Sequence, residues 1–243
     1  MKRSFALMAL VLVGGCAGIL NLPETHRPQS HTVQGGDTLY SIAWHYGLNY
    51  HVVAEWNGIE PPYRIYPGQR IFLYPGHASS AESGGVAKRG NESDDASKTE
   101  TFPAPRGGKT GARPGSSASA PQWQWPAEGA VRRTFGQSGI AGKGIVIAGK
   151  LGEPVRAAAG GTVVYSGDAL VGYGRLIIVK HNDRWLSAYA HNQRLLAHEG
   201  ETVSAGDRIA TMGRAPNGDP ALYFEIRKDG APVNPLHYLS DRR

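Results

Sequence analysis

Histidines are the residues in the C-terminal half of this 243-residue chain best suited to hydrolytic chemistry, because a neutral imidazole can bind zinc or transfer a proton near neutral pH. Three of them, His181, His198 and His237, show no spacing typical of paired metal ligands. A strand-like stretch near the end of the chain carries Tyr223 at its centre. Tyrosine is a poor zinc ligand at neutral pH, because its ordinary pKa lies near 10. These residues alone therefore offer no evident set of zinc ligands.

The start of the chain carries its only cysteine, Cys16. Lys2 and Arg3 precede an apolar run from Phe5 to Val13 and two glycines, which is the order of a secretory signal, and the run is too short to span a bilayer. The cysteine after these glycines resembles a bacterial lipobox, which implies a signal peptide over residues 1–15 and a lipidated tether over 16–29. The following Ala17 implies sorting to the outer membrane. The alternative is an ordinary signal peptide with an incidental cysteine.

Composition divides the rest of the chain into two folded units. Residues 77–124 are rich in Ser, Gly, Ala, Lys, Asp and Pro, which predicts a disordered linker because so little apolar surface can be buried there. The net charge of +6 lies mainly in the C-terminal unit. Cell wall and membrane head groups are anionic partners for an exported basic chain, and no nucleic-acid partner is expected.

The first unit, residues 30–76, has the pattern strand, helix, helix, strand. The segment 31–34 reads as a strand, and the stripe Leu39, Ile42, Ala43 and Tyr46 predicts a helix with Asp37 as its N-cap. A second helix is expected after the N-cap Asn49, ending at Asn57-Gly58, and residues 69–74 read as the closing strand. The unit is a small α+β domain.

These motifs resemble the LysM domain, in the order Val33-x-x-Gly36-Asp37-Thr38-Leu39-x-x-Ile42-Ala43, Asn57-Gly58-Ile59 and Pro67-Gly68-Gln69-x-Ile71. The resemblance implies binding to the N-acetylglucosamine units of peptidoglycan glycan chains. It places the sugar in a shallow groove between the first strand–helix loop and the second helix–strand loop. The residues implied to contact the sugar are Gly36, Asp37, Thr38, Leu39, Ile59 and Pro67.

The second unit, residues 125–243, predicts an all-β fold. Short segments rich in β-branched residues alternate with Gly, Asp and Asn turns, as in antiparallel sheets. The expected strands are 144–148, 154–157, 161–166, 175–181, 185–190, 207–212 and 221–227.

The strand order and motifs of this unit resemble the lysostaphin-type (LytM) zinc endopeptidases. The matching segments are 144–148, Gly161-Thr162-Val163-Val164-Tyr165-Ser166-Gly167, Gly172-Tyr173-Gly174, 177–181, Tyr189-Ala190-His191, Val203-x-Ala205-Gly206-Asp207 and 220–227. The run 161–191 together with Val233-Asn234-Pro235-Leu236 is similar to the NlpD branch of outer-membrane lipoproteins.

The resemblance also implies that the metal site is lost. Active members bind zinc through a His-x-x-x-Asp motif and the second His of a His-x-His strand. Here the ligand positions fall on Gly142, Val146 and Tyr223, and the first, catalytic His position of the strand falls on Ala221. His191 alone keeps its family identity, and in active members this histidine acts on water without holding the metal. No cofactor is expected.

Without the metal, the cleft is expected to bind a peptide or a helix. Val146, Ala221 and Tyr223 are predicted to line it, with His191 and Tyr189 near its floor. Tyr and Arg are enriched among binding anchors, which adds Tyr173, Arg175 and Arg227 to the expected groove. The alternative for Tyr223 is that it only fills space left by the lost ligands.

The NlpD resemblance implies a partner and a location. Members with a degenerate LytM domain activate periplasmic N-acetylmuramoyl-L-alanine amidases by moving a helix that blocks the amidase active site. The chain is accordingly expected to be a non-enzymatic amidase activator in cell division, lipid-anchored in the outer membrane, facing the periplasm and enriched at the septum. Two alternatives remain: a purely structural link between outer membrane and wall, and an active zinc endopeptidase.

Overall fold

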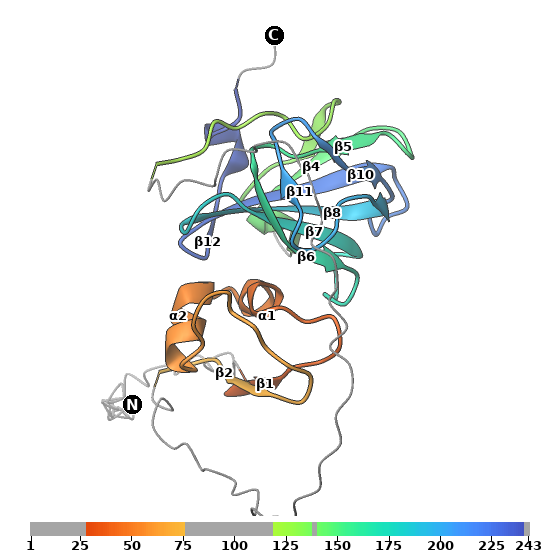
Figure 1. The fold of residues 1–243 in the computed structure, drawn as a ribbon. Helices are drawn as coiled ribbons and strands as arrows, with labels where there is room; N and C mark the ends of the chain where they lie inside the picture. Colours follow the sequence, from red (N-terminus) through yellow and green to blue (C-terminus); the bar gives the residue numbers. More distant parts are fainter. Residues whose placement is uncertain (1–27, 76–118, 138–139, 241–243) are drawn as a thin grey trace, which may run out of the picture.

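The protein is described here from a computed structural model that places residues 28–75, 119–137 and 140–240. Figure 1 shows two units, a small helical one and a larger β-sheet one, connected by the segment 76–118. The predicted signal, Cys16 and nearly all of the predicted linker lie outside the described residues. Within the described ranges no helix is both long and apolar enough to cross a membrane.

The first unit has the predicted order of elements. Two short antiparallel strands, β1 (Ser30–Thr32) and β2 (Arg70–Phe72), flank the helices α1 (Leu39–Tyr46) and α2 (Tyr50–Trp56). The predicted strands at 31–34 and 69–74 are therefore shorter or shifted by one to two residues, while the small α+β fold is confirmed.

The N-cap of α1 differs from the prediction. Thr38 caps the helix: its hydroxyl accepts from the Ser41 amide at 3.0 Å, and the Ser41 hydroxyl accepts from the Thr38 amide at 3.0 Å. This reciprocal pair is a capping box with serine at the third helical position. Asp37 instead accepts from the Gln34 amide at 2.9 Å and lies 2.8 Å from Nε2 of His31, so it stabilises the preceding turn. Asp37 and Thr38 are both residue types that can cap a helix, and α1 is capped by the second of them.

The second helix begins as predicted and is tied to the sheet at its end. The Asn49 side chain accepts from the His51 amide at 2.9 Å and caps α2. Asn57 closes the helix with a negative φ, and the next residue, Gly58, takes the left-handed conformation. The Asn57 amide group donates to the Val53 and Phe72 carbonyls, and its oxygen accepts from the Phe72 amide. One side chain thus joins α2 to β2.

The second unit is the predicted all-β domain. Its strands are β3 (Val131–Arg133), β4 (Ile145–Ala148), β5 (Pro154–Arg156), β6 (Gly161–Gly167), β7 (Arg175–Lys180), β8 (Trp185–Leu195), β9 (Thr202–Val203), β10 (Arg208–Met212), β11 (Ala221–Lys228) and β12 (Ala231–Val233). Two 3₁₀ turns, η1 (Ile140–Lys143) and η2 (Pro235–His237), complete the described elements. The main sheet runs in the order β3-β4-β11-β8-β7-β6-β9, with every strand pair antiparallel.

Alternation along the central strands gives this sheet two apolar faces. On β11, Leu222, Phe224 and Ile226 enter the core that the sheet shares with β5 and β10, while Tyr223 points to the opposite face. Strand β7 divides in the same way, since its four apolar residues (176–179) alternate between the two clusters. A sheet that is apolar on both faces requires cover on both.

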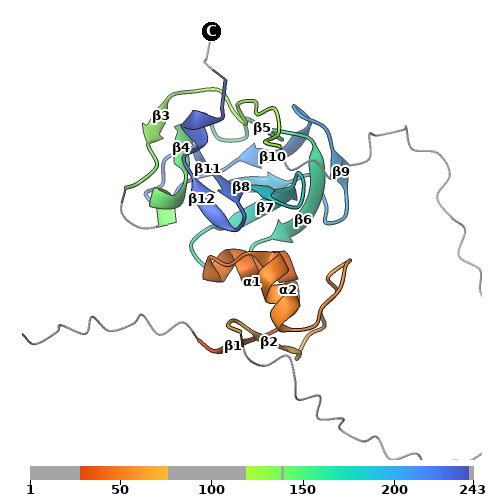
Figure 2. The same ribbon diagram turned by 90° about the vertical axis from the view of Figure 1, so that its left-hand side faces the viewer.

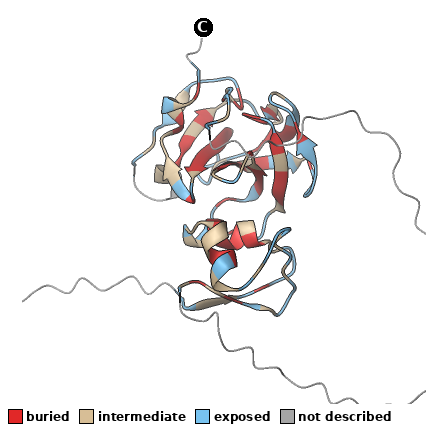
Figure 3. Cartoon of the chain, turned by 60° about the vertical axis from the view of Figure 1, so that its left-hand side comes forward, coloured by how far each residue is buried: buried red, intermediate tan, exposed pale blue. Residues whose placement is uncertain are grey.

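The first unit provides the cover for the second face. Helices α1 and α2 lie against the sheet formed by β6, β7, β8 and β11, and strands β1 and β2 lie on the side away from it (Figure 2). The interior of the first unit and this sheet face form one continuous cluster of buried side chains, which Figure 3 shows as red on both sides of the junction. The sheet residues of this cluster are Val164, Tyr165, Leu170, Tyr173, Leu176, Ile178, Leu186, Ala188, Ala190 and Tyr223.

The second unit also begins before residue 125, the boundary expected from composition. Trp123 is 5% exposed, packs in the core of this unit and forms a bridge with Leu239. Gln124 donates its amide to the Ala158 carbonyl at 2.7 Å. The two residues were assigned to the linker because their neighbours are polar, and a single tryptophan in such a stretch was the signal for the boundary.

Candidate functional site: the covered face of the sheet

Strand β11 forms the floor of the candidate site. Its odd-numbered residues Ala221, Tyr223, Glu225 and Arg227 point away from the main core, because side chains alternate between the faces of a strand. Tyr223 is paired with Val146 of β4 on one side and with Ala190 of β8 on the other. The three central predictions for the groove, Val146, Ala221 and Tyr223, are therefore neighbours on one face.

A buried hydrogen-bonded chain runs along this floor. The Tyr223 hydroxyl donates to Oε2 of Glu225 at 2.7 Å, and Nε of Arg227 donates to Oε1 of the same carboxylate at 2.6 Å. All three side chains are at most 1% exposed. Burial raises the pKa of Glu225, and the neighbouring Arg227 and Tyr223 act in the opposite direction. Burial and the Glu225 carboxylate raise the pKa of Tyr223, so its phenol stays protonated.

The chain of polar groups ends on the first unit. Nη1 of Arg227 donates to the Trp44 carbonyl at 2.8 Å, and the guanidinium carbon lies 3.6 Å from the centroid of the Trp44 ring. A cation placed over an indole face is stabilised by the ring quadrupole, most strongly where water is excluded. Trp44 is 2% exposed, so this contact is fully covered.

Two further predicted residues lie beside Tyr223. The Tyr173 and His191 rings have their centroids 5.8 Å and 5.9 Å from that of Tyr223. Burial raises the pKa of Tyr173 to about 12. Burial lowers the pKa of His191, and a hydrogen bond to the Gly172 backbone opposes this shift, so the imidazole is neutral at neutral pH. His191 has a φ of 62°, a left-handed conformation that is uncommon outside glycine.

The residues at the ligand positions do not fit zinc. Val146 has no donor atom, and the Tyr223 hydroxyl is already held by Glu225. The backbone at Gly142 has no room for any side chain, because a Cβ there would overlap the carbonyl oxygen of Gln137. Among the described residues no group of three or more His, Cys, Asp or Glu could hold a metal ion. The geometry provides an apolar face with one buried cation, which suits binding.

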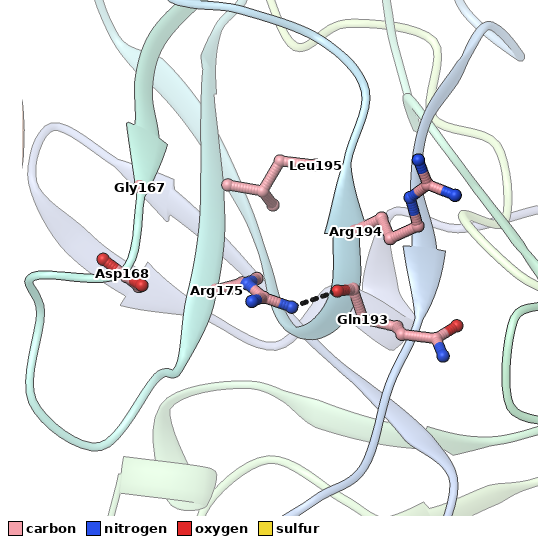
Figure 4. Close-up of a pocket in the computed structure, with 6 residues that line it drawn as sticks. All are labelled: Gly167, Asp168, Arg175, Gln193, Arg194 and Leu195. Atoms are coloured by element: carbon pink, nitrogen blue, oxygen red, sulfur yellow. Dashed lines mark hydrogen bonds between the residues drawn. The ribbon is translucent and has the colours of Figure 1, made fainter.

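Two residues expected in the groove lie elsewhere. Tyr189 is on the core side of β8, where its hydroxyl accepts from the Ala158 amide at 2.7 Å. The reason is strand alternation, since Ala188 and Ala190 occupy the groove side of β8. Arg175 lies in an edge pocket of about 370 Å³ and donates to the Gln193 carbonyl, as Figure 4 shows. Both predictions for a place beside Tyr223 were wrong.

The structure also places the predicted sugar contacts of the first unit. Leu39 is 0% exposed and packs in the core, so it cannot contact a sugar in this conformation. Gly36 and Pro67 are exposed, and Asp37, Thr38 and Ile59 are partly exposed. Ile59 lines a surface hollow of about 520 Å³ with residues of the α2–β2 loop. The remaining five residues stay available as a candidate glycan surface.

Sequence reasoning missed two residues of the site. Glu225 is a fully buried carboxylate between Tyr223 and Arg227, and its place on the same face of β11 could have been read from the i, i+2 spacing. Trp44 could have been found from helical periodicity. Leu39, Ile42, Ala43 and Tyr46 already form the inner stripe of α1, so a large aromatic side chain outside that stripe required a second packing partner.

Comparison with known proteins identifies both units. Residues 31–73 match the LysM domain, and residues 141–235 match Peptidase family M23. The order of the two matches is the order predicted from the sequence motifs.

Similar proteins are found in Pseudomonas aeruginosa and Escherichia coli. "Lipoprotein NlpD/LppB homolog" of Pseudomonas aeruginosa is 44% identical over 234 residues, which covers 87% of this chain and 77% of that protein. "Murein hydrolase activator NlpD" of Escherichia coli is 38% identical over 270 residues, covering 91% and 71%. "Uncharacterized lipoprotein YgeR" of E. coli is 35% identical over 243 residues, covering 98% and 94%. With both domains in the same order and similarity across most of its length, the chain belongs to the NlpD/LppB family of lipoproteins.

Proposed function

We propose that this protein is a non-catalytic activator of a periplasmic N-acetylmuramoyl-L-alanine amidase and promotes septal peptidoglycan hydrolysis during daughter-cell separation. The observation that carries the proposal is the face around Tyr223. It keeps the strands of a peptidase groove, while its ligand positions hold Gly142, Val146 and Tyr223. A relative at 38% identity is named a murein hydrolase activator, which supports the same assignment.

The physical character of the face supports binding to a partner helix. Ala221 and Ala190 carry small side chains on this face of the sheet, and Tyr223 and Val146 carry larger side chains beside them. Arg227 supplies one buried cation that can hold a carbonyl and an aromatic ring together. A groove lined by apolar groups with one fixed polar anchor is the usual receptor for an amphipathic helix. Activation then requires tighter binding to the open amidase than to the closed one.

The other parts of the chain would determine where in the cell envelope this activity occurs. We propose that Cys16 carries the lipid that anchors the protein in the outer membrane facing the periplasm, with enrichment at the septum. The LysM unit would bind peptidoglycan glycan strands through Gly36, Asp37, Thr38, Ile59 and Pro67. The lipoprotein names of the relatives and the LysM match support these two attachments.

The proposal is tested with the full mature chain carrying Cys16→Ser and a purified amidase from the same organism. The mixture is expected to release more peptidoglycan fragments than the amidase alone, while the activator alone releases none. Val146→Asp should abolish most of the stimulation, because a carboxylate on this apolar face opposes partner binding.

Val171→Asp is the matched control, because Val171 lies in the same domain and is 80% exposed. It should stimulate as the unchanged chain does. Thermal unfolding establishes that both variants are folded. Failure of the unchanged chain to stimulate any amidase of its organism would contradict the proposal and favour a structural link between membrane and wall. Fragment release by the activator alone would favour a peptidase.

A further inference from the structure

The surface proposed to bind the amidase is already covered by this protein's own first unit. Tyr223 is 1% exposed, and Leu176, Ile178 and Ala188 beside it are fully buried in the cluster shared by the two units. Helices α1 and α2 lie across this face (Figure 2). A partner helix cannot occupy the same face at the same time.

The contact is centred on the last turn of α1. The carbonyl groups of the last helical turn lack helical donors of their own and lie at the negative end of the helix dipole. The Trp44 carbonyl lies in this turn, where it accepts from the Gly47 amide at 3.2 Å and also from Nη1 of Arg227 at 2.8 Å, while the Trp44 ring covers the guanidinium. Arg227 thus binds an aromatic residue at the C-terminal end of a helix.

Helix α1 is built for two packing partners. Its inner stripe, which includes Leu39, Ile42 and Ala43, packs within the LysM unit. Tyr40 and Trp44, one turn apart, share a different side of the helix. The Trp44 side chain reaches the sheet, and the Tyr40 ring packs against Tyr50 with centroids 4.5 Å apart. Fold stability of the LysM unit alone does not explain a buried tryptophan on this side.

Polar contacts close the rim of the junction. Nζ of Lys180 lies 5.4 Å from the Tyr50 ring centroid, and Nε2 of His51 lies 3.0 Å from the Asp183 carbonyl. At Gly230 the two backbones approach so closely that an added Cβ would lie 2.6 Å from Cα of Asn49. Apolar centre, cation–π anchor and polar rim together have the anatomy of a specific interface.

We propose that the LysM unit masks the partner-binding face of the peptidase-like domain, with Trp44 held on Arg227 in the place of the amidase helix, and that undocking of this unit exposes the face. This inference rests on the proposed function and adds its regulation. Gly36 and Pro67 remain exposed in the docked state, so the protein can hold glycan and stay masked at once.

The inference specifies the partner. A competitor for this face must supply what α1 supplies, which is an aromatic side chain near the C-terminal end of a helix and a carbonyl within reach of Arg227. Masking lowers the apparent affinity for such a helix by the fraction of molecules that are open. Weakening the junction from the LysM side should therefore strengthen amidase binding.

The test uses two variants of the full mature chain with Cys16→Ser. Trp44→Ala removes the anchor. His51→Asp places a carboxylate near Asp183 and Asp229, both acidic, while its position in the first turn of α2 keeps the LysM helix stable. If about a tenth of the unchanged molecules are open, each variant should lower the half-maximal activator concentration about tenfold in amidase stimulation. Small-angle scattering should show expansion of both variants.

Glu55→Gln and Tyr66→Ala are the matched controls for the scattering measurement, since both side chains are exposed and lie on the LysM unit outside the junction. Neither should expand. Glu55→Gln should also stimulate the amidase as the unchanged chain does, whereas Tyr66 lines the hollow beside Ile59 and is left out of that assay. If the unchanged chain stimulates and the two expanded variants stimulate no better, masking is overturned while the proposed function stands. If expanded variants and unchanged chain all fail to stimulate, the proposed function falls and the inference with it. Absence of expansion in both folded variants overturns the proposed anchor contacts.

Discussion

At the scale of single residues, the site combines three groups that would each be costly alone. Glu225 is a buried carboxylate, Arg227 a buried cation and Tyr223 a buried hydroxyl, and they are hydrogen-bonded to one another and, through Arg227, to the Trp44 carbonyl. Buried ion pairs add little stability by themselves, but losing one partner leaves an uncompensated charge. The pair therefore fixes the position of the Arg227 guanidinium under the Trp44 ring more than it stabilises the fold.

His181 provides a pH prediction at the same scale. Its Nδ1 lies 2.8 Å from the Gly160 carbonyl and its Nε2 lies 2.8 Å from the Ser187 hydroxyl, and burial lowers the pKa of the imidazole to about 4. In the unfolded chain its pKa is near 6.5, so the unfolded state binds the extra proton between these two values. Stability is complete above pH 6.5 and falls by about 3 kcal/mol as the pH drops to 4.

Denaturant unfolding at a series of pH values measures this dependence. The slope between pH 6.5 and 4 should be smaller in His181→Gln, which cannot titrate, even if that variant is less stable overall. His198→Gln is the control, because His198 is exposed on a turn. An unchanged slope in His181→Gln would show that other groups cause the acid loss.

At the scale of elements, the sequence predicted most of the fold and less of the site. Periodicity and turn residues located both helices and seven strands, because each has its own apolar pattern. The bounds of β4, β5, β6, β7, β10 and β11 agree within one residue, and β8 ends five residues later than predicted. The face reached by a side chain was harder to predict. Tyr189 was assigned to the groove from its motif, whereas strict alternation along β8 sends it to the core. Arg175 was assigned to the groove from its residue type, whereas alternation along β7 puts it on the side of Ile177 and Val179, opposite the face of Leu176 and Ile178.

The loop before β4 gives a prediction for the lost metal site. Restoring all four family residues, as Gly142→His, Val146→Asp, Ala221→His and Tyr223→His, should not restore stoichiometric zinc binding. A side chain at Gly142 would overlap the Gln137 carbonyl, so the first ligand cannot reach its place. Metal analysis after dialysis against zinc measures the outcome.

The three-residue variant that retains Gly142 is the comparison for this experiment. Both variants should hold equally little zinc if the backbone at Gly142 is the obstacle. One equivalent of tightly held zinc in the four-residue variant alone would show that the loop adapts.

At the scale of the whole molecule, the sequence predicted two separate units and the structure joins them. The contact between the two units was missed because composition identifies the segment that connects them but does not show which surfaces pack together. Two local signals pointed to it: an aromatic residue outside the inner stripe of α1, and apolar residues on both faces of β7 and β8. Each signal indicates that its residues are buried against another part of the protein. Neither signal could identify the other as its partner.

The shared interior predicts coupled unfolding. In calorimetry the full chain should unfold in one coupled transition. Unfolding of the LysM unit would uncover the sheet face and expose the apolar surface around Leu176 and Ile178. Trp44→Ala should separate this into two transitions, with the LysM unit melting first since it is the smaller. Tyr66→Ala should retain the single transition. Two well-separated transitions in the unchanged chain would contradict the coupling.

The covalent connection between the two units determines how the open fraction depends on the concentrations of this protein and of its partner. Because α1 and its docking face belong to one molecule, closing is a first-order event, and the masked fraction is independent of how many copies the envelope contains. Binding of the proposed amidase partner would be second-order and would rise with amidase concentration. Making more of this protein would therefore raise the number of open molecules only in proportion to its copy number. A modest rise in the concentration of a well-matched competitor helix would instead raise the fraction of molecules that are open. Such a protein responds to the abundance of its partner more than to its own.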